Sequence, residues 1–302
     1  MGIEVRFVDP ADPENFLKAT DDRTRAYYGE VLPNPSFEVF PLKEVADLGK
    51  PLGIPLIVDN TAAPVICKPF DHGASVLLHS TTKYIGGHGN SIGGILVDSG
   101  NFEWEKFPER QPKLNTPDPS YAGAVWTEAV KPLGPIAYIL KARVTLLRDM
   151  GAAMSPFNAF MFLTGMETLP LRMREHSKNA VKVADFLKSH KKVEKVIYPT
   201  EVAVERAEKY LSGGNGGLMG FEIAGGRDAG KKFINSLELL YHVANIGDSK
   251  SLAIHPASTT HSQLSEDELS DAGVTPGFVR LSIGLEHIDD IIADIEQALD
   301  KA

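Results

Sequence analysis

The chain has 302 residues, of which 43% are hydrophobic and 24% charged, enough to build the core of one large or two ordinary domains. Its formal net charge of −9 and pI near 5.5 argue against a nucleic-acid surface, because phosphate binding needs clustered Lys and Arg. The one cysteine, Cys67, cannot form an internal disulfide, which fits a reducing compartment. The sequence shows no positively charged apolar leader and no apolar run of membrane-span length, so we expect a cytoplasmic protein.

The first half of the sequence alternates strand and helix patterns. Short apolar runs bounded by turn residues predict strands, and apolar residues spaced three and four apart predict helices. Such alternation is typical of a mostly parallel sheet covered by helices. In chain order we expect a strand over residues 5–8, a helix over 13–19, a strand over 25–31, a helix over 42–52, and strands that end at Asp59 and His79.

Residues 100–135 form a Pro-, Asn- and aromatic-rich insert without clear periodicity. A long irregular insert inside a compact domain is often a functional loop. Helical spacing then returns over residues 136–144. We expect these segments to complete a large domain over residues 1–165.

A second unit begins near Glu167 and is expected to form a smaller α+β domain over residues 166–302. Its patterns predict a helix over 172–189, strands over 218–223 and 279–283, and a terminal helix. The terminal helix carries an apolar stripe that packs and takes no part in chemistry: Ile288, Ile291, Ile292, Ile295 and Leu299.

Polar side chains follow two of the predicted strands of the large domain. Asp59 ends one strand, and Ser80, Thr82 and Lys83 follow the next. In α/β sheets ligands gather at the carboxyl ends of the strands, so these groups should converge on one pocket. A Gly-rich loop beside a lysine also suggests a nucleotide phosphate loop, but there the glycines precede the lysine, and here they follow it.

Pyridoxal phosphate (PLP) needs an amine to bond its aldehyde, small donors for its phosphate and a carboxylate beside its pyridine nitrogen. Lys83, Ser80 with Thr82, and Asp59 supply these groups. The alternative is that Lys83 is a surface lysine and Asp59 a strand-end cap, and composition alone leaves both interpretations open.

The sequence motifs of this chain resemble those of the Cys/Met-metabolism family of PLP enzymes, which have the aspartate-aminotransferase-like fold (fold type I). The two main motifs are Val58-Asp59-Asn60-Thr61 and the run from His79 through Lys83 to Gly89. The likeness covers essentially the whole chain. It continues through Ser155-Pro156, Leu171-Arg172-Met173, His255 to Ser262 and Arg280 to Glu286.

The resemblance implies a role for each matching residue of the cofactor site. Lys83 would bond the cofactor aldehyde and shuttle protons, Asp59 would pair with the pyridine nitrogen, and Ser80 and Thr82 would hold the phosphate. Asn34 matches a residue near the phenolic oxygen of the cofactor, although a plain Asn-Pro turn is the alternative.

Two further residues match the substrate side of the family's site. Arg280 matches the arginine that holds the substrate α-carboxylate, a task that suits its planar fork. Without the resemblance, Arg280 would be read as a surface ion pair. Asn245 falls beside the substrate carboxylate, where several relatives carry serine.

The sequences of two segments, residues 101–121 and 244–252, are similar to those of O-acetylhomoserine sulfhydrylases rather than to those of methionine γ-lyases or cystathionine enzymes. The resemblance then implies that lysine-mediated proton shifts expel acetate, and that sulfide or a thiol adds to give homocysteine. It also implies a dimer-based tetramer with shared sites. Ala122 departs from the histidine common in the insert motif, and the other transsulfuration activities stay open as alternatives.

The other candidate residues have simpler explanations. His79, His88, His255 and His261 lack metal-site spacing and are expected to be structural, and Cys67 is expected to pack. The family's N-terminal segment, with a phosphate loop, a ring-stacking aromatic and residues lent to the neighbouring subunit, has no counterpart in this sequence. This favours a second hypothesis, a catalytically silent subunit that keeps the fold.

Overall fold

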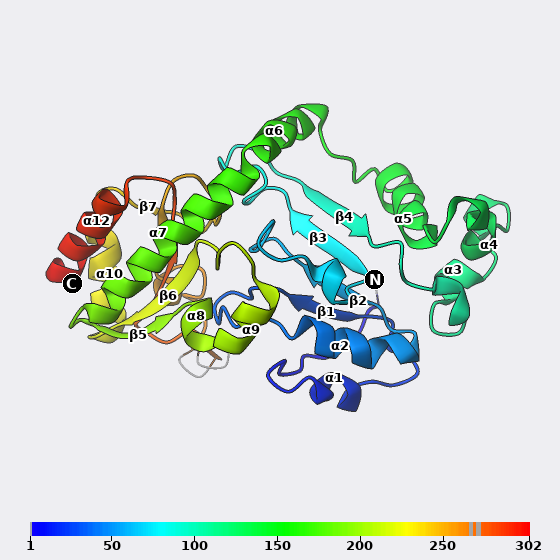
Figure 1. Cartoon of the computed structure of the whole chain (residues 1–302), viewed down its shortest axis with the longest axis horizontal. Coiled ribbons are helices and arrows are strands. Elements are labelled where there is room, and N and C mark those ends of the chain that lie inside the picture. Colours follow the sequence, from blue (N-terminus) through cyan, green and yellow to red (C-terminus); the bar gives the residue numbers. More distant parts are fainter. Residues whose placement is uncertain (1, 266–267, 270–272) are drawn as a thin grey trace.

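The computed structural model describes residues 2–265, 268–269 and 273–302. The strands of these residues form a four-stranded sheet in the first half of the chain and a five-stranded sheet in the second half (Figure 1). Helices α6 (Pro156–Glu167) and α7 (Leu169–Ser189) connect the two halves, and α7 runs diagonally along the second sheet.

The first sheet has the order β1-β2-β3-β4. Its strands β1 to β3 pair in parallel, and β4 pairs antiparallel to β3, so the predicted mostly parallel sheet is confirmed. Helices α1 and α2 and several one-turn helices accompany it, including turns over Lys50–Leu52 and Pro69–His72. The bounds are β1 Tyr27–Glu30, β2 Leu56–Asp59, β3 Val76–Ser80, β4 Gly94–Asp98, α1 Glu14–Lys18 and α2 Leu42–Gly49.

Helix α2 packs on this sheet because its apolar residues recur at helical spacing. It buries Leu42, Val45, Ala46 and Gly49, three or four residues apart on one face. The buried residues of β1 and β2 join the same hydrophobic core. The parallel order of the strands leaves the carboxyl ends of β2 and β3 next to each other, which is what positions the candidate site.

The strand predicted over residues 5–8 is wrong. These residues form no ladder, and Phe7 is 94% exposed. A strand needs the backbone of a neighbour, and among the described residues β1 pairs only with β2. Strand β4 was not predicted, although a short apolar run follows the glycines of the lysine motif.

The insert over residues 100–135 is more ordered than predicted. It contains short helices that pack around Trp104 and Trp126, and this cluster contacts Val76 at the start of β3. Trp126 Nε1 donates to Asp118 Oδ2 at 2.9 Å, and Lys141 pairs with the same carboxylate. The helices of the insert are α3 Pro112–Asn115 and α4 Trp126–Ala129, with one-turn helices over Trp104–Lys106, Pro119–Tyr121 and Lys131–Leu133; α5 Ala137–Ala142 and a π-helix over Arg143–Asp149 follow it.

The second sheet has the order β5-β6-β9-β8-β7 and is antiparallel except between β7 and β8. Helices α7, α10 and α12 pack with it around a core that includes Phe221, Phe233 and Ile295. The predicted terminal helix and both predicted strands are therefore present, while the division at residues 165/166 stays a prediction. The remaining bounds are β5 Val193–Ile197, β6 Leu218–Ile223, β7 Tyr241–His242, β8 Leu252–Ile254, β9 Phe278–Ser282, α8 Pro199–Val202, α9 Val204–Tyr210, α10 Gly226–Ser236 and α12 Ile288–Lys301, with a one-turn helix over Pro256–Ser258.

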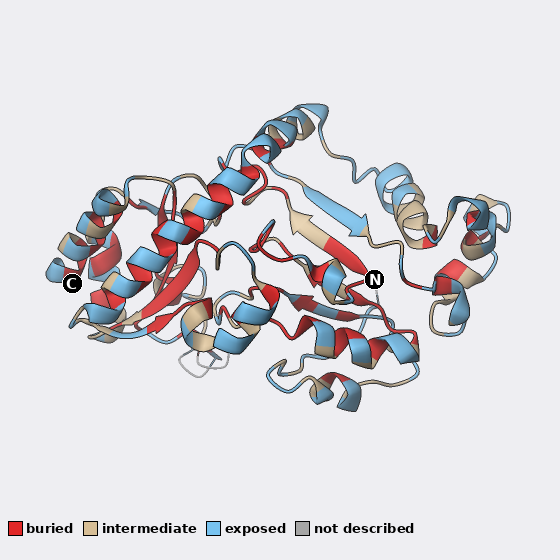
Figure 2. Cartoon of the chain, viewed as in Figure 1, coloured by how far each residue is buried: buried red, intermediate tan, exposed pale blue. Residues whose placement is uncertain are grey.

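Exposed apolar side chains are frequent on β4, on the segment before it and on α6, and we call these residues together the β4–α6 face. It belongs to β4, which is mostly exposed, and to the outer side of α6 (Figure 2). The two elements are linked, because Asn158 Nδ2 on α6 donates to Ile92 O before β4 at 2.9 Å. Its members are Ile92, Ile95, Leu96, Val97, Phe157, Phe160, Leu163 and Met166.

No helix in the described part of the chain is long and apolar enough to span a bilayer.

Candidate active site

Lys83 lies in the turn that follows β3. The turn is closed by Lys83 N, which donates to Ser80 O at 3.2 Å. The Lys83 side chain is part-buried, and its Nζ donates to Asn245 Oδ1 at 2.5 Å. Burial and the nearby Arg280 guanidinium lower the pKa of Lys83, which increases the fraction of neutral amine near pH 7. A neutral amine is the form that attacks an aldehyde or accepts a proton.

Arg280 reaches the same place from the middle of the second sheet. It stands on β9, is 9% exposed, and donates through Nη2 to Asn245 O at 3.2 Å. Its burial lowers its pKa. The structure therefore brings Lys83, Asn245 and Arg280 together from three distant parts of the sequence, as a single site requires. Their roles stay predictions.

Asp59 and Ser80 end the neighbouring strands β2 and β3 and are joined by Thr61. Thr61 N donates to Asp59 Oδ1 at 2.7 Å, and Ser80 N donates to Thr61 Oγ1 at 2.7 Å. Burial, reinforced by the Asp59 carboxylate, raises the pKa of Tyr28 on β1 to about 12. Ser80 also begins the turn that contains Lys83, so Asp59 is linked to the lysine through Thr61 and Ser80.

The two remaining predicted residues lie less centrally. Thr82 Oγ1 is already engaged, since it accepts from Gly93 N at 3.1 Å and donates to Gly93 O at 3.3 Å. Asn34 is exposed in the loop after β1, and no hydrogen bond within the described residues joins it to the other predicted site residues. The structure therefore brings Lys83, Asn245 and Arg280 into contact and links Asp59 and Ser80 to them through the turn after β3, while Thr82 bonds to Gly93 and Asn34 lies outside this set.

The side chains at this edge fit PLP. Lys83 offers a half-buried amine, Asp59 a carboxylate, and the Ser80 hydroxyl makes no hydrogen bond within the described residues. The neighbouring Thr81 hydroxyl is buried without a partner. An amine, an acid and free hydroxyls at the ends of adjacent strands are the donor set that this cofactor uses.

No role was predicted for three buried polar residues on one face of α7: Arg172, His176 and Asn179. They recur four and three residues apart, so they share one face of the helix. This spacing was visible in the sequence. Polar residues that share one face of a helix that otherwise packs in a core indicate buried hydrogen bonds on that face.

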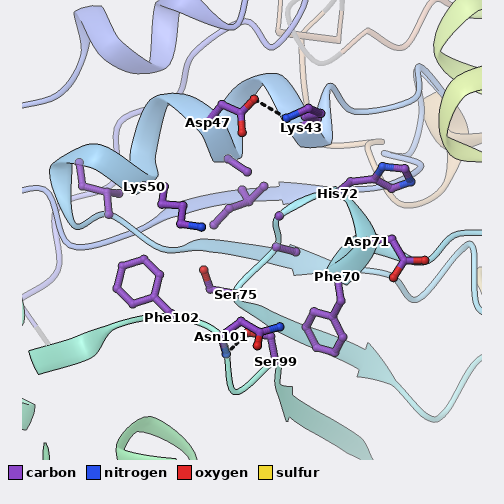
Figure 3. Close-up of a pocket in the computed structure, with 15 residues that line it drawn as sticks. Lys43, Asp47, Lys50, Phe70, Asp71, His72, Ser75, Ser99, Asn101 and Phe102 are labelled. Atoms are coloured by element: carbon purple, nitrogen blue, oxygen red, sulfur yellow. Dashed lines mark hydrogen bonds and ion pairs between the residues drawn. The ribbon is translucent and has the colours of Figure 1, made fainter. Parts of the chain in front are cut away.

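A separate pocket of about 430 Å³ lies at the other end of the first sheet (Figure 3). It is bounded by α2, the start of β2 and the segments before β3 and after β4, where Ser75 and Ser99 line it. The Lys43–Asp47 ion pair on its α2 wall spans 2.7 Å. None of the predicted site residues lines this pocket, so it is not the candidate active site.

Two residues set aside in the sequence analysis are held inside the protein. His255 is buried and both its ring nitrogens have partners, Ser258 Oγ and Pro276 O, each at 2.8 Å. Cys67 is buried, and burial raises the pKa of its thiol to about 12. A neutral buried thiol is inert, so Cys67 packs as expected.

Comparison with known proteins agrees with this geometry. A family model described as Cys/Met metabolism PLP-dependent enzyme matches residues 1–300. An O-acetyl-L-homoserine sulfhydrylase of Leptospira meyeri is 53% identical over 99% of this chain and 70% of its own length, and one from Thermus thermophilus is 46% identical over 99% and 71%.

A crystal structure of an O-acetylhomoserine (thiol)-lyase from Campylobacter jejuni superposes with a TM-score of 0.93 at 41% identity. It carries N'-pyridoxyl-lysine-5'-monophosphate, and the match covers 99% of this chain and 71% of that one. The expected fold class is therefore confirmed. The chain spans about 70% of the length of these relatives.

Proposed function

This chain belongs to the Cys/Met metabolism PLP-dependent enzyme family, and from that premise we propose that it forms homocysteine and acetate from O-acetylhomoserine and sulfide. The sulfhydrylase names of its relatives support the substrate pair. The observation that carries the proposal is the contact of the Lys83 amine with Asn245 beside Arg280, because it sets a proton-transfer group next to a carboxylate-binding group.

PLP, when bound, supplies an electron sink that stabilises negative charge at the substrate carbons next to the amino group. Lys83 would bond its aldehyde, Asp59 would keep the pyridine nitrogen protonated, Ser80 and Thr82 would hold the phosphate, and Asn34 would lie near the phenolic oxygen. The lysine and the acid stand on one sheet edge, which supports this assignment.

The protein's own residues orient the substrate and move protons. Arg280 would bind the substrate α-carboxylate through its two parallel N–H groups. Lys83, with its lowered pKa, would take a proton from Cα and then one from Cβ as acetate leaves Cγ, and would return protons to Cβ and Cα as sulfide adds at Cγ. Asn245 would hold the Lys83 amine through Oδ1 and place it beside the carboxylate.

The test compares three reactions of the purified, PLP-loaded chain. We expect homocysteine from O-acetylhomoserine plus sulfide to form faster than products from O-succinylhomoserine plus cysteine or from methionine elimination. The PLP-loaded parent chain should be yellow and should be bleached by borohydride, and Lys83→Ala should lose both the yellow absorbance and turnover. A preference for either of the other two reactions would assign the chain to another transsulfuration activity.

A second candidate is a catalytically silent subunit that keeps the fold. Its support is that the Thr82 hydroxyl is already bonded to Gly93, and that exposed Asn34 makes no hydrogen bond to the other predicted site residues within the described part of the chain. In that case the folded chain would bind PLP through Lys83 and would turn over none of the three substrates. Turnover of O-acetylhomoserine within tenfold of the Leptospira meyeri relative would exclude it.

We also propose that copies of the chain associate, as a dimer-based tetramer, through the β4–α6 face. Helix α6 has apolar residues on every side, yet only Phe162 and Gly165 are buried, and a helix of that kind is normally covered. Sedimentation should report an oligomer that Phe160→Asp dissociates and that Val204→Asp, an exposed apolar position on α9, leaves intact. A monomeric parent protein would refute the association.

The cytoplasm is the proposed location. The only cysteine is buried and unpaired, which is compatible with a reducing compartment. Fractionation of the source cells with an antibody to the chain tests this, and recovery outside the cytoplasmic fraction would contradict it.

A further inference from the structure

One face of α7 carries three buried polar side chains that all bond to backbone carbonyls. Arg172, His176 and Asn179 are 5%, 0% and 1% exposed. Apart from Gly165 O on α6, their carbonyl acceptors lie in two segments, the one that follows Lys83 and the one that follows β9. A single rigid helix face is therefore bonded to both sides of the candidate site.

Arg172 holds the lysine side. Its Nη1 donates to Tyr84 O at 2.7 Å, and its Nη2 donates to Ile85 O at 3.2 Å and to Gly165 O at 2.7 Å. No carboxylate lies within ion-pair distance of Arg172 in the described parts of the chain. Backbone carbonyl oxygens and the Thr168 hydroxyl, which accepts from Nε at 3.2 Å, compensate this buried charge, so the guanidinium and the Lys83 segment hold each other in place.

His176 and Asn179 hold the arginine side. His176 Nδ1 donates to Ile283 O at 2.7 Å, and the ring stays neutral because burial lowers its pKa to about 4. Asn179 Nδ2 donates to Gly284 O and to Glu286 O, both at 3.1 Å. Residues 283–286 directly follow β9, the strand that carries Arg280.

A third segment closes this set of contacts. Ser249 donates through N and through Oγ to Gly87 O, both at 2.8 Å, and Leu285 N donates to Ser249 O at 2.8 Å. Ser249 lies four residues after Asn245, which accepts from both Lys83 and Arg280. The lysine segment, the Asn245 loop and the end of β9 are thus joined in a ring.

We propose that Arg172, supported by His176 and Asn179, is the positioning residue that sets where the Lys83 amine stands relative to Arg280. The helix separates its two groups of acceptors by a fixed distance, one to two turns along its axis. A displacement of about 1 Å at a reacting group is enough to slow catalysis strongly. The proposal rests on the proposed function for its kinetic part only.

The first measurement needs no turnover. PLP capture by Lys83 is followed by absorbance and by borohydride-fixed peptide mass across the pH range. The charged group that faces Lys83 is Arg280, and burial is the main reason why the lysine pKa is low. Arg172→Met should loosen the segment that follows Lys83 and let water reach the lysine amine. Because hydration favours the charged amine, the lysine pKa and with it the pH midpoint of PLP capture should rise by about half a unit or more.

The second measurement is kinetic. Arg172→Met should lower kcat at least tenfold with a smaller change in KM, while Asn179→Ala, on the Arg280 side, should act mainly on KM. Arg172→Lys keeps the charge and one bond and should recover part of both effects. Lys178→Ala, an exposed position on the same helix, is the matched control and should change neither.

The outcomes separate the two ideas. An unchanged capture midpoint in folded Arg172→Met, with kcat lowered only in proportion to the folded fraction and KM unchanged, would leave Arg172 a purely structural residue and overturn the proposal. A raised midpoint in a chain that does not turn over O-acetylhomoserine would support the positioning role and reject the proposed reaction. Parent protein that never captures PLP would overturn both.

Discussion

Gly87, in the segment that follows Lys83, should tolerate no side chain because its neighbour is the Arg172 guanidinium. Its φ is +73°, and a Cβ added there would lie 2.3 Å from Arg172 Nη1 and 2.7 Å from Cζ. Gly100 is a matched control, since its φ is +67° and nothing lies within 4 Å of its added Cβ. The two glycines differ only in what surrounds them.

The structure sets the expected magnitudes. The left-handed backbone costs an alanine about 1–2 kcal/mol at either position. At Gly87 the methyl group must also displace the guanidinium, and each hydrogen bond lost from a charged donor is worth about 1.5–3 kcal/mol. We therefore expect Gly100→Ala to lose about 1–2 kcal/mol of unfolding free energy and Gly87→Ala about 3–5 kcal/mol.

Urea unfolding with linear extrapolation measures both variants. In an Arg172→Met background the clash is gone, so the extra loss caused by Gly87→Ala should shrink by at least about 1 kcal/mol in a double-mutant cycle. Equal losses for Gly87→Ala and Gly100→Ala, or strict additivity with Arg172→Met, would refute the reasoning.

Three further predictions concern charge, buried hydrogen bonds and the thiol. Arg280→Gln removes a cation that lowers the pKa of Lys83, so the pH midpoint of PLP capture should move to higher pH, and an unmoved midpoint would contradict this. Asp294→Ala leaves the N–H groups of residues 238–240 without the carboxylate they bond at 2.8–2.9 Å, and urea unfolding should show a loss of about 3–5 kcal/mol, larger than for Asp294→Asn. Cys67, buried with a thiol pKa of about 12, should react with a thiol reagent only after unfolding, and fast labelling of the native protein would be inconsistent with its packing.

Much of the fold could be predicted because secondary structure depends on local spacing. Apolar runs ended by polar turns located β2 and β3, and helical periodicity located α2, α7 and α12. The polar groups at the ends of β2 and β3 could be assigned to one edge because parallel neighbouring strands end side by side.

The failures arose where partners decide the structure. Residues 5–8 have a strand-like pattern, but a strand forms only when another backbone offers hydrogen bonds. The insert over residues 100–135 lacks periodicity, yet two tryptophans give its short helices a shared core. Local spacing holds no information about either outcome.

The sequence by itself determined which groups the candidate site contains: the amine of Lys83, the acid of Asp59 and the hydroxyl of Ser80, all close together along the chain. Only the tertiary structure decided what the amine meets, because Asn245 is 162 residues away from Lys83 and Arg280 lies further still. The same is true of Arg172, whose bonds to the lysine segment cross 87 and 88 residues. The spacing of apolar residues that predicts helices and strands extends over a few residues of the chain. A side-chain hydrogen bond between distant residues forms only where the packing of separate elements brings two atoms within about 3 Å.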